Sequence, residues 1–72
     1  MIIKNGFVCD QIGEWINLRV IHSFYTYSER VGKEMKYLIK AKTPWGDLEI
    51  TEYFDTEDEA QKELDDAFGF TE

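Results

Sequence analysis

The chain of 72 residues has few of the features that mark secreted, membrane or export-directed proteins. Cys9 is its only cysteine, so no intramolecular disulfide can form, whereas secreted domains of this size usually contain several. No stretch approaches the roughly 18 apolar residues of a membrane span. The first residues also lack the long apolar core of a signal peptide. We therefore expect a cytoplasmic protein with no membrane partner.

Residues that commonly carry chemistry are equally scarce. His22 is the only histidine, and no second histidine or cysteine stands at a spacing that would complete a metal site with it. Cys9 lies in an apolar stretch, where a packed, inert thiol is commoner than a nucleophile. The catalytic alternative is a Cys9 nucleophile served by His22 and an acid. We expect no catalytic residue, metal or cofactor, and infer that the protein is not an enzyme.

Basic residues are almost absent from the second part of the chain. The net charge is -7, and it divides into +3 for residues 1–46 and -10 for residues 47–72, where Lys62 is the only base. Such acidity disfavours non-specific binding to nucleic acid or to an anionic membrane. We therefore expect no direct nucleic-acid partner.

One basic row argues in the opposite direction. Lysines alternate along one expected strand, and tyrosines stand nearby in the sequence, a combination found on sheets that bind single-stranded nucleic acid. The overall acidity and the expected position of Glu49 beside the row argue against this function. The residues concerned are Lys36, Lys40, Lys42, Tyr25, Tyr27 and Tyr37.

Aromatic and β-branched residues crowd positions 15–54 and indicate strands there. Glu34–Thr43 alternates between apolar and polar residues, as a strand with one buried face does. Thr43-Pro44-Trp45-Gly46 has the chemistry of a type I turn, and a four-residue loop, 44–47, leads into a return strand over 48–54. This loop predicts three cross-strand pairs: Lys42 with Glu49, Ala41 with Ile50, and Tyr37 with Phe54.

Shorter elements are expected before this hairpin. Asn5-Gly6 is typical of a tight hairpin turn, and the residues between 19 and 28 suit a strand with both faces covered. The remaining expectations are a strand over Phe7-Val8-Cys9, a turn over Gln11–Glu14, an apolar segment over Trp15–Leu18 and a polar loop over Glu29–Lys33.

The C-terminal part predicts a helix over about 57–68. Thr56 with Glu59 three residues later forms a capping-box pattern. An apolar stripe at helical spacing follows, and Gly69 and Phe70 suit the end of the helix. The stripe consists of Ala60, Leu64, Ala67 and Phe68. We therefore predict one α+β domain over residues 1–72, an antiparallel meander of about four strands packed by one C-terminal helix.

Two stretches carry a family resemblance. Trp15-Ile16-Asn17, followed by Ile21 and Phe24, resembles the opening of a group of small uncharacterised proteins of bacteria and their phages. The segment 54–60, Phe-Asp-Thr-Glu-Asp-Glu-Ala, is similar to the strand-to-helix joint of the same group. The resemblance implies a short antiparallel sheet closed by one acidic helix. It implies no activity and no functional residues.

Four residues are candidates for partner binding: Trp45, Asp58, Asp65 and Asp66. Trp45 stands at a hairpin tip, where it either anchors a partner or folds over the end of the sheet. Asp65 and Asp66 lie near a helix C-terminus, where the helix dipole favours bases, so the acids serve either solubility or a basic partner.

We predict a non-enzymatic interaction or regulatory domain that acts through a protein–protein surface. The alternative is an acidic mimic of nucleic acid that inhibits a nucleic-acid-binding protein. A weak homodimer is also expected, because the core is thin and edge strands are unpaired.

Overall fold

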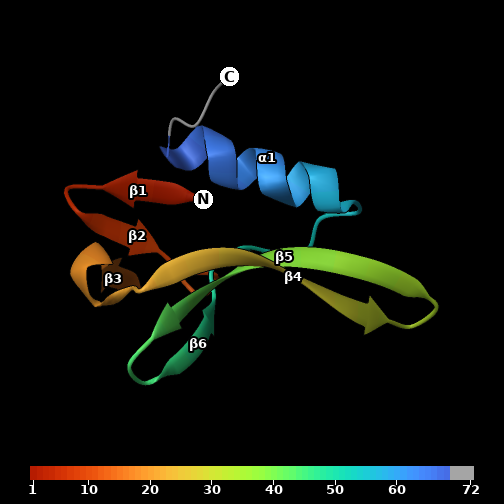
Figure 1. The fold of residues 1–72 in the computed structure, drawn as a ribbon, viewed down its shortest axis with the longest axis horizontal. Coiled ribbons are helices and arrows are strands. Elements are labelled where there is room, and N and C mark those ends of the chain that lie inside the picture. Colours follow the sequence, from red (N-terminus) through yellow and green to blue (C-terminus); the bar gives the residue numbers. More distant parts are fainter. Residues whose placement is uncertain (69–72) are drawn as a thin grey trace.

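The computed structural model describes residues 1–68, and these residues form two three-stranded antiparallel sheets and one C-terminal helix (Figure 1). The N-terminal sheet has the order β1-β2-β3 and the second sheet the order β4-β5-β6. The elements are β1 (Ile2–Lys4), β2 (Phe7–Cys9), β3 (Trp15–Asn17), the 3-10 helix η1 (Leu18–Val20), β4 (Ser23–Val31), β5 (Glu34–Thr43), β6 (Gly46–Glu49) and α1 (Glu57–Phe68). The α+β class is confirmed, but the expected single meander is divided into two sheets.

The N-terminal sheet begins with the predicted hairpin. Asn5 and Gly6 both have positive φ, at 53° and 81°, as the central residues of a type I′ turn require. The register places Ile3, Val8 and Ile16 side by side across the three strands. These side chains face the core, and Val8 is fully buried. Their alternate neighbours therefore face outward.

The two sheets are separated by η1. The side chain of Asn17 accepts a hydrogen bond from the N–H of Arg19 at 2.9 Å and so begins the 3-10 turn. This turn ends β3 and redirects the chain before β4 starts at Ser23. β4 then extends to Val31, so the predicted loop over 29–33 shrinks to Gly32 and Lys33.

The predicted register of the β5–β6 hairpin is wrong by two residues. Lys42 lies opposite Asp47 and Ala41 opposite Leu48, rather than opposite Glu49 and Ile50. The reason is a two-residue loop between Thr43 and Gly46, which pair with one another. The hydroxyl of Thr43 accepts from the N–H of Trp45 at 3.2 Å and donates to the carbonyl of Gly46 at 2.6 Å. These bonds close the turn directly after Thr43, so the return strand starts at Gly46, two residues earlier than predicted.

The third predicted pair, Tyr37 with Phe54, is confirmed. Their backbone groups exchange hydrogen bonds of 3.0 and 2.6 Å. The chain restores this pairing by placing residues 51–53 opposite Leu38 alone, which adds two residues to one side of the ladder. Within this bulge, the hydroxyl of the buried Thr51 accepts the backbone N–H of Ile39 at 3.0 Å. The Thr51 hydroxyl therefore takes the place of a backbone carbonyl as the acceptor for the Ile39 N–H.

Both sheets contribute to one hydrophobic core. Val8 of β2 packs with Ile39 and Ala41 of β5 and with Ile50, and all four are buried. The helix covers the β4–β5 sheet in Figure 1 and contributes Leu64 to this core. Ala60, at the start of the predicted stripe, is fully buried. The N-terminal sheet is therefore part of the same packed unit.

The helix has the predicted bounds, Glu57–Phe68. Near its C-terminal end the rings of Phe24 and Phe68 lie 5.0 Å apart between centroids. The α-ammonium group of Met1, the residue before β1, donates to Glu63 Oε1 of the helix at 2.5 Å. The predicted roles of Gly69 and Phe70 lie outside the described residues.

The predicted cap at Thr56 is confirmed, because its hydroxyl accepts the N–H of Glu59 at 3.2 Å. We expect Thr56→Ala to lower the free energy of unfolding by about 0.5–2 kcal/mol, since the helix loses an acceptor for one of its first N–H groups. Urea denaturation measures this change, with Thr56→Ser as the control that keeps the hydroxyl. Equal stability of the alanine and serine variants would show that the cap contributes nothing.

Candidate functional site

The outer face of the N-terminal sheet is apolar. Because β2 pairs with both β1 and β3, its outward residues lie in cross-strand rows with those of its neighbours. Ile2, Phe7 and Trp15 keep 60%, 40% and 50% of their surface exposed. One row consists of Ile2, Cys9 and Trp15, and the next of Lys4, Phe7 and Asn17. We call these six residues the outer N-terminal face.

A shallow hollow lies on this face. It has a volume of about 390 Å³ and is lined by Lys4, Asn5, Phe7 and Trp15, with almost wholly apolar exposed atoms. The two aromatic rings supply apolar area, and Lys4 is the only charged side chain in the lining. An apolar side chain with a carboxylate beside it therefore fits the chemistry of this hollow.

Trp45 occupies the turn between β5 and β6 and keeps 77% of its surface exposed. It therefore does not fold over the end of the sheet. The β5–β6 turn points away from α1 in Figure 1. As a result, Trp45 does not share a surface with the three predicted helix acids.

The three acids of α1 that were predicted to bind a partner have different surroundings. Asp58 and Asp66 are exposed, whereas Asp65 is half-buried and accepts a hydrogen bond from Gln61 Nε2 at 2.9 Å. Asp65 also lines a small hollow formed with Phe24 and Leu64. The structure thus presents Asp58 and Asp66 to solvent and engages Asp65 within the helix.

Acids stand opposite or beside the basic row on β5. Lys40 and Lys42 lie opposite Glu49 and Asp47 across the β5–β6 pair. Lys36 Nζ is 2.6 Å from Asp55 Oδ1 and also contacts Glu34. Hydrogen bonding to these acids raises the pKa of Lys36, and its bond to Asp55 lowers the pKa of that carboxyl. Lys36 is therefore ion-paired, and Lys40 and Lys42 each have an acid as their cross-strand neighbour.

Tyrosines of β4 lie on the same face as these lysines. Lys40 Nζ is 3.9 Å from the centroid of the Tyr27 ring, and Lys42 Nζ is 5.7 Å from that of Tyr25. The hydroxyl of Tyr25 donates to the Asp47 carboxylate, and this bond raises the pKa of Tyr25 to about 12. Lys40 and Lys42 thus make cation–π contacts with Tyr27 and Tyr25.

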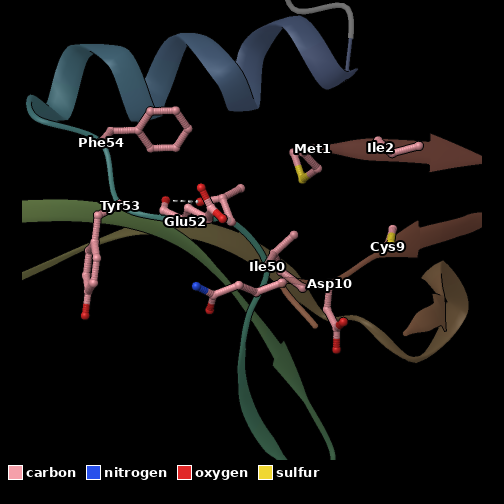
Figure 2. Close-up of a pocket in the computed structure, with 10 residues that line it drawn as sticks. Met1, Ile2, Cys9, Asp10, Ile50, Glu52, Tyr53 and Phe54 are labelled. Atoms are coloured by element: carbon pink, nitrogen blue, oxygen red, sulfur yellow. Dashed lines mark hydrogen bonds between the residues drawn. The ribbon is translucent and has the colours of Figure 1, made fainter. Parts of the chain in front are cut away.

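A depression separates the N-terminal sheet from the segment that follows β6 (Figure 2). It has a volume of about 360 Å³, and its lining includes Cys9 and Asp10 but not His22, which is exposed before β4. Asp10 Oδ1 accepts the N–H groups of Ile12 and Glu14 at 3.1 and 2.8 Å, so it holds the predicted turn. The depression thus does not combine Cys9 and His22 as catalysis would require.

Groups of three or more histidine, cysteine or acidic side chains that could hold a metal ion do not occur within residues 1–68. In the same range, no helix has both the length and the apolar character needed to cross a bilayer. A scan against protein-family models finds no match, and searches of curated proteins and of solved structures find no significant match.

Proposed function

We propose that the protein is a small, non-enzymatic interaction domain that binds another protein through its outer N-terminal face. The observation that carries the proposal is the exposure of Ile2, Phe7 and Trp15 together on one side of a three-stranded sheet. Their inward neighbours face the core, whereas these outward side chains remain exposed and available for contact. Exposed apolar groups that gather on one face are typical of interfaces.

The chemistry of the face suits one kind of partner surface. Covering an exposed apolar side chain contributes about 25 cal/mol per Å² of apolar area removed from water. Tryptophan is also among the residues that most often dominate binding energy. Lys4 borders the hollow and offers a charge for an acidic residue of the partner. The partner is therefore a protein with a protruding apolar side chain close to a carboxylate.

The helix supports a second candidate function, an acidic mimic of nucleic acid that occupies a nucleic-acid-binding protein. Glu57, Asp58, Glu59 and Asp66 are all exposed on α1, whose last turn holds no base. Such binding would weaken steeply with salt, since charges in water are screened within about 10 Å at 0.1 M. Lys62 interrupts the acidic surface, and Asp65 is engaged by Gln61, which favours the apolar face as the primary site.

Capture from a lysate of the organism that encodes the protein separates these functions. We expect Trp15→Ser to reduce recovery of the specific partner at least tenfold, because a central aromatic anchor contributes about 2 kcal/mol or more. Quantitative mass spectrometry compares this variant with the parent and with Trp45→Ser, which changes the same residue type elsewhere. The Trp45→Ser variant should retain the partner.

The double variant Asp65→Lys, Asp66→Lys provides the third arm. The helix dipole favours bases at these positions, so this variant should fold as stably as the parent. The proposal would be overturned if this double variant lost the partner while Trp15→Ser still recovered it. That result would favour the acidic mimic of nucleic acid. Failure of the parent to retain any specific partner would also contradict it.

A further inference from the structure

The longest unprotected strand edge in the described residues belongs to β4. β4 is nine residues long and hydrogen-bonds to β5 alone within residues 1–68, so it forms one edge of its sheet. None of its residues is buried, in contrast to β5, where Leu38, Ile39 and Ala41 are buried. An edge of this kind presents a row of N–H and C=O groups that another strand can pair with.

β4 has few of the features that usually block strand edges, and its only charged side chains are Glu29 and Arg30. Natural edges are shortened, or carry lysine, proline or bulges. The other edge strands in residues 1–68, β1, β3 and β6, have only three or four residues each. β4 contains neither proline nor lysine, and its nine residues pair with β5 without a bulge.

The charge of β4 fits a second copy of the same strand. The chain has a net charge of -7, but β4 carries only Glu29 and Arg30 and is neutral. An antiparallel pair of identical strands has a two-fold axis through one residue, and with Tyr27 on that axis all nine residues of each strand are paired. Glu29 then lies opposite Tyr25, and Arg30 opposite Phe24, so no like charges face one another.

We propose that the protein forms a weak homodimer in which two β4 strands pair antiparallel to give one continuous six-stranded sheet. The contact involves about nine residues on each side, fewer than the roughly 20–30 of a standard stable interface, so the dimer forms only at high protein concentration. Such isologous pairing closes on itself and does not generate fibres. The β4 edge and the outer N-terminal face lie on different sheets, so the two proposed contacts use different strands.

Analytical ultracentrifugation of the full chain tests this proposal. Between about 10 and 500 μM, we expect the average mass to rise from the 8.5 kDa of the monomer towards twice that value. Tyr27→Lys should hold the mass at 8.5 kDa, because it would place two lysines opposite one another on the axis. Met35→Lys is the matched control, since Met35 is similarly exposed but lies on β5.

Disulfide cross-linking provides a second measurement that does not depend on the lysine variant folding. In a Cys9→Ser background, Tyr27→Cys should give a covalent dimer on mild oxidation, and Met35→Cys should not, because only the axial residue meets its own copy. A monomer throughout the concentration range would overturn the proposal. So would a dimer that survives Tyr27→Lys, or one that is lost with Trp15→Ser, which would assign self-association to the outer N-terminal face. Tyr27→Lys should still capture the lysate partner. Failure of the homodimer proposal can therefore be distinguished from failure of the proposed partner surface.

Discussion

Replacing Ile39 with alanine is expected to lower the free energy of unfolding by about 2–5 kcal/mol. Ile39 has no exposed surface and packs with Val8 and Ile50, so the substitution removes buried methyl groups and leaves a cavity between the two sheets. At about 0.05–0.15 kcal/mol per residue, a chain of this length has a total stability of roughly 4–11 kcal/mol. The variant should therefore lose a large share of the total stability, and its unfolding midpoint should fall markedly.

Urea denaturation followed by circular dichroism measures this loss. Ile12→Ala is the matched control, because Ile12 is 78% exposed and its truncation should change stability by less than about 0.5 kcal/mol. The two sheets should also unfold in one transition in the parent, since they share a core. A similar, small effect of both substitutions would contradict the position assigned to Ile39.

Thr51→Val is expected to lower the free energy of unfolding by about 1–3 kcal/mol. The substitution keeps the shape of the side chain, but it removes the hydroxyl that accepts the N–H of Ile39 at 3.0 Å. Thr51 is only 8% exposed, so water does not readily replace the lost acceptor. The Ile39 N–H would then be buried without a partner.

Thr51→Ser is the control for this prediction. Serine keeps the hydroxyl and loses only a methyl group, so it should cost less than valine although valine is more apolar and has higher strand propensity. Amide hydrogen exchange adds a local measurement, because the Ile39 amide should lose protection in the valine variant alone. Greater stability of Thr51→Val than of Thr51→Ser would show that the hydroxyl does not support the bulge.

The elements that could be predicted from the sequence are those with local causes. The helix from 57 to 68 follows from a cap and an apolar stripe, both of which act within a few residues. The Asn5-Gly6 hairpin follows from two residues that tolerate positive φ. These signals do not depend on the rest of the fold, and the structure contains both elements as predicted.

The β5–β6 register could not be predicted because two side-chain hydroxyls determine it. Thr43 closes a two-residue turn, and Thr51 replaces a backbone acceptor where the strand bulges. Pairing rules that consider only charge and apolar character favoured Lys42 opposite Glu49, which the tighter turn excludes. The division into two sheets was missed for a similar reason, since it depends on the short turn that Asn17 begins.

The outer N-terminal face could not be predicted from the sequence. Trp45 was singled out by its place in a turn and is exposed, but it is not part of this face. Phe7 and Trp15 were missed because their strands have three residues each, too few for alternation to distinguish an inner face from an outer one. The available signal was that these short strands are apolar at adjacent positions, which leaves one apolar side chain facing outward once its neighbour is buried.

The most direct test of the outer N-terminal face is NMR of the ¹⁵N-labelled protein in unlabelled lysate from the organism that encodes it. We expect the amide signals of β1, β2 and β3 to broaden or shift first, while those of the β5–β6 turn and of α1 remain unchanged. A spectrum in which Asp58 and Asp66 respond instead, or in which no residue of the N-terminal sheet responds, would contradict it.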